Sequence, residues 1–349
     1  MIGGPRLSIL GSVELTEART MARDIHTDHA SYQLSGFVDG VWHPEDLVEL
    51  PGTSWVIVSC MRSADHAGGL FKVDTAQPSH ATELRWAPAA QQARLGPQIF
   101  DPHGIAARRL ADETFELLVV DHGGGEAIDR LVIELGEEGP FVATGERLVQ
   151  PPRTSANAVA YLPDGGFVMT SMFDPTDREF VSRFARAEPT GQVWRWSPAK
   201  GWSRFGDRPM SGANGIAVSR DGFVIACEWA ARRVWRLDRD GRAVASVETD
   251  FLPDNLRWTA DGRLLLAGQS TRPEVLFGCE ARGDRCPLAF KVVRLDPTSL
   301  AIESLIAIDE AGAKAEGFGG ATGAMQVGEQ IWVGSFTGQR IGIFSPSSA

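Results

Sequence analysis

Asp254 and Asn255 stand side by side in the segment FLPDNLRW, just before an apolar run that is typical of a β-strand. Both side chains can cap backbone groups in a turn, which is the ordinary role of Asp and Asn at such a place. Their oxygen atoms can also bind a hard metal cation. The choice between these roles depends on what stands at comparable places elsewhere in the chain.

Six segments share one pattern: a polar start, an alternating apolar strand, a turn that is often Asp-Gly, and a second apolar strand followed by a third. Strands separated by such turns indicate β-hairpins, and a repeat of roughly 40 to 60 residues is typical of propeller blades with loop insertions. The sequence therefore predicts an all-β, six-bladed β-propeller with four-stranded antiparallel blades around a central channel, as one domain over residues 1–349. The six starts are Glu45-Asp46, His103-Gly104, Asn157, Asn214-Gly215, Asp254-Asn255 and Thr322-Gly323.

A propeller must also close, so that its first and last blades leave no exposed strand edge. We expect the segment LSILGSVEL (7–15) to add an outer strand to the last blade, whose own final strand is RIGIFS (340–345). Helical patterns are scarce, and LTEARTMARDI (15–25) is the best candidate for a helix.

The polar starts become a ring once the strands are placed in a propeller. The innermost strands run along the channel, so residues at equivalent starts point toward one mouth of it. Two carboxylates and three amides at one point favour Ca²⁺, because Zn²⁺ prefers more His or Cys and Mg²⁺ keeps more water. A ring of backbone caps is the alternative. The expected metal ligands are Glu45, Asn157, Asn214, Asp254 and Asn255.

Two histidines could supply a proton acceptor. His103 occupies a repeat start, and His122 follows the strand FELLVVD of the same repeat, so both are expected near the same mouth. Imidazole titrates near neutral pH and is the usual base for activating water, although either residue could be a hydrogen-bonded structural histidine. The chain has no Gly-x-Ser-x-Gly elbow, phosphate-binding loop or HExxH pattern. Water activated at a metal is the chemistry that remains.

The amino-acid composition limits the classes of molecule that this protein is expected to bind. The 349 residues contain 34 Lys and Arg against 45 Asp and Glu, a net charge of −11, which argues against nucleic acid or an anionic membrane as a partner. No apolar run is long enough to span a bilayer, and no export signal is recognisable at the start, so a cytoplasmic location is the default expectation unless the chain is a processed form. Oligomeric state is not predicted.

The four cysteines form two groups. Cys60 and Cys227 lie in apolar runs and are expected to be buried free thiols. Cys279 and Cys286 frame the loop GCEARGDRC, which is more typical of a small disulfide-closed loop than of a metal site.

The order of these motifs resembles the six-bladed calcium propellers of the gluconolactonase (senescence-marker-protein-like) superfamily, and most of all its paraoxonase and arylesterase branch. The segments that carry the resemblance are PEDLVELP, HGI (103–105), LLVVDH (117–122), NAVA, ANGI and PDNL. The resemblance implies the same five calcium ligands and makes His103 and His122 a histidine dyad. It implies hydrolysis of lactones or other esters, with phosphotriesters as a side activity.

One position departs from this family. A second, structural calcium deeper in the channel would use Asp46, the carbonyl of Ile105 and an acid that is Ala158 here. One catalytic calcium is therefore expected, and a second ion would lack a charged ligand.

The resemblance also implies a mechanism. Calcium would polarise the carbonyl group while His103, helped by His122, takes a proton from the attacking water; Asp254 could instead attack or orient that water. We expect an apolar pocket at the channel mouth that favours a hydrophobic lactone, with the insertion 173–190 as a lid. Its expected lining is Trp42, Met61, Met172, Phe173, Trp229, Phe318 and Phe336. A strictosidine-synthase-like enzyme and a non-catalytic binding propeller are the alternatives.

Overall fold

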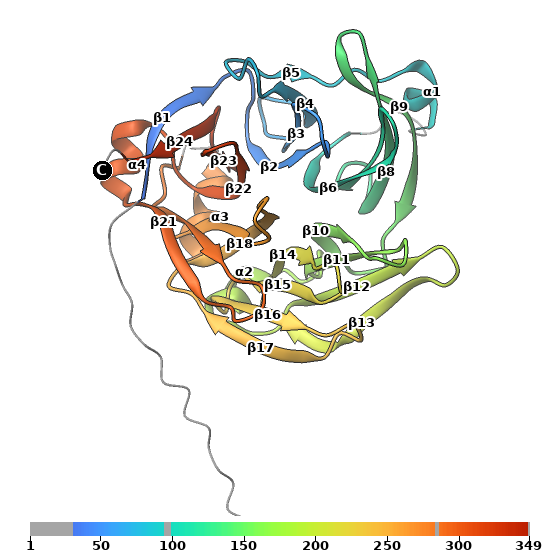
Figure 1. The fold of residues 1–349 in the computed structure, drawn as a ribbon. Helices are drawn as coiled ribbons and strands as arrows, with labels where there is room; N and C mark the ends of the chain where they lie inside the picture. The colour runs from blue at the N-terminus through green and yellow to red at the C-terminus, as the bar shows by residue number, and fades with distance from the viewer. Residues whose placement is uncertain (1–30, 94–98, 283–285, 348–349) are drawn as a thin grey trace, which may run out of the picture.

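The alternating apolar segments form short β-strands in the computed structural model, which describes residues 31–93, 99–282 and 286–347. Within these residues the strands make six sheets of four antiparallel strands each. Figure 1 shows the sheets arranged radially about a central axis, as the blades of a propeller. The predicted fold class is confirmed.

The blades are numbered here in chain order, with strands given from the axis outwards. Blade 1 contains β2 (Pro44–Glu49), β3 (Trp55–Cys60), β4 (Gly69–Asp74) and β5 (Thr82–Glu83). Blade 2 contains β6 (Pro102–Ala111), β7 (Thr114–Asp121), β8 (Ala127–Gly136) and β9 (Gly139–Val149). Blade 3 contains β10 (Ser155–Tyr161), β11 (Phe167–Phe173), β12 (Gly191–Ser197) and β13 (Gly201–Met210).

The second half of the chain repeats this arrangement. Blade 4 contains β14 (Ala213–Val218), β15 (Val224–Glu228), β16 (Arg233–Leu237) and β17 (Ala243–Glu248). Blade 5 contains β18 (Leu252–Trp258), β19 (Leu264–Gln269), β20 (Phe290–Leu295) and β21 (Ile302–Ile308). Blade 6 contains β22 (Ala321–Val327), β23 (Gln330–Ser335), β24 (Ile341–Pro346) and β1 (Tyr32–Val38).

The strands pack on both faces, which explains why several of them are continuous apolar runs. In β19, Leu264 and Leu266 pack in the cluster shared with blade 4, whereas Leu265 packs in the cluster shared with blade 6. Successive side chains of a strand point to opposite faces, so each face of a blade is buried against a different neighbour. Of the seven apolar clusters among the described residues, six bridge adjacent blades in this way.

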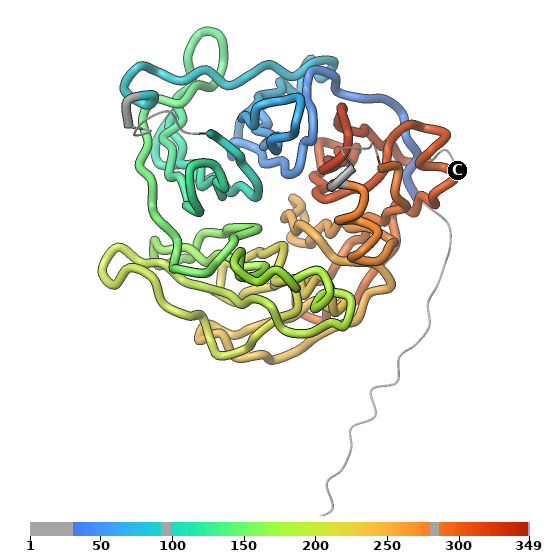
Figure 2. The backbone as a smooth tube through the Cα atoms, turned by 180° about the vertical axis from the view of Figure 1, so that it is seen from behind, coloured from blue at the N-terminus to red at the C-terminus, as the bar shows by residue number. Residues whose placement is uncertain are grey.

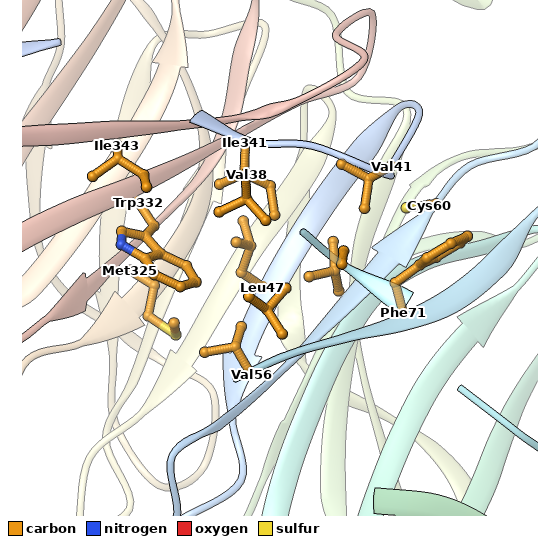
Figure 3. Close-up of a cluster of buried hydrophobic side chains, with 13 residues drawn as sticks. Val38, Val41, Leu47, Val56, Cys60, Phe71, Met325, Trp332, Ile341 and Ile343 are labelled. Carbon is orange, nitrogen blue, oxygen red and sulfur yellow. The ribbon is translucent and has the colours of Figure 1, made fainter. Parts of the chain in front are cut away.

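Blades 6 and 1 meet in one of these clusters, shown in Figure 3. Trp332 of β23 is fully buried there beside Leu47 of β2 and Val38 of β1. Cys60 belongs to the same cluster and, like Cys227, is a buried free thiol, as predicted. The circle of blades is thus sealed by apolar packing as well as by strand pairing.

The last blade is closed by a strand from the beginning of the described chain. β1 pairs antiparallel with β24, and the two views show it beside the C-terminal segment (Figures 1 and 2). The strand expected to close the blade, residues 7–15, lies outside the described residues, as does the helix expected at 15–25. The outer-strand position is instead filled by Tyr32–Val38, which supplies Val38 to the interface between blades 6 and 1.

Four short helices occur among the described residues, and none of them is long and apolar enough to cross a membrane. Two helices lie in insertions of blades 3 and 5 and contact each other. The helices are α1 (Pro88–Ala93), α2 (Phe180–Ala185), α3 (Pro273–Arg282) and α4 (Glu310–Glu316).

Candidate metal centre

The polar starts of the repeats lie near the beginning of the innermost strands, and the backbone is irregular at each of these places. In all six inner strands the register with the next strand shifts around the polar residue. Such a bulge interrupts the alternation of a strand, so that Asp254 and its neighbour Asn255 are both buried near the channel. The shifts fall between Pro44 and Asp46, Pro102 and Ile105, Ala156 and Val159, Ala213 and Ile216, Pro253 and Leu256, and Ala321 and Ala324.

Glycines next to the ring allow neighbouring inner strands to approach closely. A Cβ atom on Gly104 would lie 2.3 Å from the carbonyl oxygen of Asn157, and one on Gly215 would lie 2.0 Å from that of Asp254. Both distances are shorter than any real contact, so only glycine fits. The glycines thereby allow β10 and β18, which carry Asn157 and Asp254, to pack closely against β6 and β14.

Hydrogen bonds from other blades hold Glu45, and a hydrogen bond within blade 5 holds Asp254. Asn255 Nδ2 donates to Glu45 Oε1 at 2.7 Å, and Thr322, at the sixth repeat start, donates its hydroxyl to the Glu45 carbonyl at 2.7 Å. Gln269 Nε2 donates to Asp254 Oδ2 at 2.7 Å and is itself held by the indole of Trp229 at 3.1 Å. Each carboxylate therefore has one oxygen engaged and one left over.

The atoms left over suit a hard cation. Buried polar atoms normally have a partner, yet one oxygen on each of four ring side chains, from four different blades, has none among the described residues. Two carboxylates and two amides of this kind match the oxygen set that Ca²⁺ takes. No group of three or more His, Cys, Asp or Glu in the described chain is arranged for a metal, so a site here depends on the amides. The four atoms are Glu45 Oε2, Asn157 Oδ1, Asn214 Oδ1 and Asp254 Oδ1.

The electrostatics of the ring also favour a cation. Burial raises the pKa of Glu45 well above its usual range, and the nearby carboxylates of Asp46 and Asp254 raise it further. Burial likewise raises the pKa of Asp254 to about 7. Negative charge is therefore unfavourable in this ring by itself, and a bound cation would offset it.

The two predicted histidines lie together beside the ring. Their rings are 5.2 Å apart in an edge-to-face arrangement. Nε2 of His103 accepts from Asn157 Nδ2 at 3.1 Å and lies 3.4 Å from Glu45 Oε1. Burial lowers the pKa of His103 well below its usual value, and a charge on His122 would lower it further. His103 is thus a neutral imidazole at neutral pH.

Glu126, which the sequence analysis did not single out, fixes the second histidine. Its Oε2 is 2.8 Å from Nδ1 of His122, and its Oε1 accepts from the hydroxyl of Ser155 at 3.2 Å. Burial alone lowers the pKa of His122, but the hydrogen bond and charge of Glu126, with the charge of Asp101, outweigh it and raise the pKa. The signal for Glu126 was its position four residues after His122 in the segment HGGGE.

Arg147 of β9 holds the loop that carries this pair. Its guanidinium donates to the carbonyls of Gly123 and Gly125, each at 2.6 Å, and contacts Asp121 at 2.6 Å. Asp121 in turn accepts from the backbone of Gly123 at 2.8 Å. The loop between His122 and Glu126 is therefore held by hydrogen bonds to both Arg147 and Asp121.

A pocket of about 320 Å³ opens above the ring, and its polar floor includes four of the predicted ligands and both histidines. Five of the seven residues predicted to line it do so. The five are Met61, Met172, Phe173, Trp229 and Phe336.

Two lining predictions are corrected by the structure. Trp42 donates its indole N–H to the Ala67 carbonyl at 3.0 Å and stacks on His66, so it packs beside blade 1. Phe318 is buried between blades 5 and 6 against Phe290 and Phe344. Both aromatic residues serve packing, the commoner role of such side chains.

The insertions of blades 3 and 5 supply an apolar wall that the sequence analysis found only in part. Phe277 and Leu276 of α3 line the pocket, and Phe277 packs against Phe180 and Phe184 of the predicted lid, α2. The Cys279–Cys286 disulfide, left open by the sequence, closes the end of α3.

Comparisons with known proteins find one short match in sequence and several solved structures with a similar fold. No family model matches the chain. A segment of 108 residues is 36% identical to L-arabinolactonase of Azospirillum brasilense, a match that covers 31% of this chain and only 31% of that protein.

Three solved structures share the fold at identities too low to indicate more than the fold. An aldose sugar dehydrogenase with bound PQQ from Streptomyces coelicolor is 16% identical, with 91% of this chain and 98% of that chain covered and a TM-score of 0.56. A luciferin-regenerating enzyme is 12% identical, with 89% and 95% covered and a TM-score of 0.55. A candidate gluconolactonase is 15% identical, with 92% and 93% covered and a TM-score of 0.54. The chain is a six-bladed β-propeller, and these three structures share that fold with it.

Proposed function

We propose that this protein is a calcium-dependent hydrolase of lactones and related carboxylic esters. One observation carries the proposal: Glu45, Asn157, Asn214 and Asp254 each have one buried oxygen without a partner among the described residues. These four side chains come from four blades and face one pocket beside a histidine pair. The segment shared with an L-arabinolactonase supports lactones as the substrate class.

The ring residues would hold the cation. Glu45 and Asp254 supply charge, Asn157 and Asn214 supply neutral oxygens, and Asn255 orients Glu45. When bound, calcium would polarise the substrate carbonyl and stabilise the negative charge that develops on its oxygen.

The histidine pair would move the proton of the attacking water. His103 is neutral because burial lowers its pKa, so it is able to accept a proton. His122 has a raised pKa because Glu126 stabilises its charged form, so a proton is held more easily there than on His103. A proton taken up by His103 would therefore pass favourably to His122, whose charged form Glu126 stabilises.

Asp254 offers a second route. Its Oδ1 has no hydrogen-bond partner among the residues that the structure describes, whereas Gln269 holds Oδ2. A carboxylate fixed in this way is able to attack the carbonyl carbon or to orient the water. The two routes differ in how strongly they depend on His103.

The pocket wall favours an apolar substrate. Phe173, Phe277, Met172 and Phe336 surround the space above the polar floor, and such a lining gains more from burying an alkyl chain or aryl group than from a sugar. We therefore place hydrophobic lactones and aryl esters ahead of sugar lactones, with phosphotriesters as a side activity.

A panel of substrates tests the proposal: an aliphatic δ-lactone, an aldonolactone and an aryl acetate, each before and after complete chelation and after addition of calcium. Turnover that disappears with chelation and returns with calcium supports it, and the preferred lactone identifies the substrate class. The variant Glu45→Gln keeps the size of the side chain and removes its charge, and it should need far more calcium. Tight calcium binding without turnover on any substrate would instead indicate a binding propeller.

A further inference from the structure

A third buried acid, Asp46, lies next to the ring, and its carboxylate is fully engaged. Its Oδ1 accepts from the backbone of Leu47 at 2.9 Å. Its Oδ2 accepts from the backbone of Ile105 at 2.9 Å and from the guanidinium of Arg257. The side chain of Asp46 is only 2% exposed, and that of Arg257 is 15% exposed, so this ion pair is largely removed from water.

The guanidinium of Arg257 is surrounded by oxygen acceptors from three blades. Nη2 donates to the Ile105 carbonyl of blade 2 at 2.5 Å, and Nε donates to the Leu47 carbonyl of blade 1 at 2.6 Å. Nη1 lies 3.3 Å from the carbonyl of Leu256 in its own strand, β18 of blade 5. One carboxylate and several carbonyl oxygens are the kind of donor set that a hard divalent cation takes.

The residue that would complete a metal site at this place points elsewhere. Ala158 packs in the apolar cluster between blades 3 and 4, and its backbone N–H is satisfied by the hydroxyl of Thr170 at 3.0 Å. Among the described residues, Asp46 is thus the carboxylate at this second position, and it is already paired with Arg257.

We propose that the guanidinium of Arg257 is the resident cation of a second position on the channel axis, where the family resemblance implies a structural calcium. The arginine joins the inner strands of three blades and neutralises Asp46, so the chain takes up metal only at the ring. The count of one ion rests on the proposed function, but the role of Arg257 does not.

Calcium stoichiometry measures this directly, by equilibrium dialysis with metal analysis on the full chain and by calorimetric titration with calcium chloride. We expect one ion per chain for the unmodified protein and for Arg257→Lys, which keeps the charge. Arg257→Ala frees the oxygens around Asp46, and we expect it to bind one more ion. The double variant Asp46→Asn with Arg257→Ala should lose that extra ion.

Thermal unfolding provides a second readout. Calcium-free Arg257→Ala should unfold several degrees below the unmodified protein, because a buried carboxylate is left unpaired, and calcium should restore more of its midpoint than it adds to the unmodified protein. Arg220→Ala is the matched control, since Arg220 lines the same lower opening of the channel as Arg257. It should change neither stoichiometry nor midpoint.

Two results would overturn the proposal: two ions bound by the unmodified protein, or an Arg257→Ala variant that folds with unchanged stoichiometry and midpoint. If Arg257→Ala fails to fold, an extra ion in Arg257→Lys would also overturn it. If the unmodified protein binds no calcium, the proposed function fails, whereas one ion gained by Arg257→Ala still supports the role of the arginine.

Discussion

Glu126 Oε2 lies 2.8 Å from Nδ1 of His122, and this contact links the histidine pair to a carboxylate that lines the pocket. The geometry fixes the ring orientation of His122 and opposes the effect of burial on its pKa. It also assigns the two histidines different tasks, because Nδ1 of His103 has no such partner in the described part of the chain.

His103→Gln should lower kcat by about 10²- to 10⁴-fold, because the variant loses a general base while keeping an amide beside Asn157. Calcium affinity and the unfolding midpoint should change little. The control is His66→Gln, an exposed histidine stacked on Trp42 away from the pocket. Turnover retained by His103→Gln would favour the route through Asp254.

Glu126→Gln should lower the pKa of His122, since it removes the largest of the influences that raise it. The His122 titration followed by NMR should move to lower pH, and kcat should fall by about 10- to 100-fold, as for other residues that orient a functional histidine. Ser155→Ala leaves the carboxylate in place and should change the titration only slightly. An unshifted titration in Glu126→Gln would contradict this role.

Calcium-free protein should lose stability as the pH rises. The pKa of Asp254 is raised from 3.8 to about 7 in the folded state, so between these values the folded chain retains a proton that the unfolded chain has released. Stability falls with rising pH wherever the folded state binds more protons.

Thermal unfolding across this range, with and without calcium, tests the sign. The gain in midpoint produced by calcium should increase from pH 5 to about 8, because the ion and the proton compete for the same carboxylates. Asp254→Asn should flatten the pH dependence of the calcium-free protein. A gain that is constant with pH would exclude Asp254 as a ligand.

Phe277→Ala should reduce kcat/KM for a long-chain lactone about tenfold more than for a short one, because it removes part of the apolar wall. Val275→Ala is a matched control on the same helix, with a side chain that is 37% exposed. Calcium binding should be unaffected in both variants. Equal losses on long and short substrates would mean that Phe277 only supports the structure.

The repeats made the fold and the ring predictable together. Blade number, strand order and the buried placement of residues such as Asn157 and Asp254 follow from one periodic pattern, because equivalent positions in a propeller meet at one axis. The pairing of His103 with His122 followed from their places at the two ends of one hairpin.

Other contacts could not be predicted from the sequence, because they join residues that do not occupy equivalent positions in the repeat. Gln269 and Arg257 act on partners in other blades or strands through long side chains, and a sequence pattern does not report where such a side chain ends. Trp42 and Phe318 show the converse, since an aromatic residue near a blade end suits a pocket and a core equally. The strand expected at 7–15 lies outside the described residues, and Tyr32–Val38, which pairs with β24, was not singled out in the sequence.

The pairing of β1 with β24 determines when the propeller is able to close during folding. Ser35 bonds the carbonyl of Ile343 across a separation of 308 positions, so the strand synthesised first among the described ones waits for the one synthesised last. Contacts of such long range form slowly, and unpaired edges invite association in the meantime. The proposed calcium ligands, which end at Asn255, are synthesised before β24 (Ile341–Pro346), but they reach one axis only when the circle of blades closes. If the ring holds calcium as proposed, calcium binding should therefore report that closure.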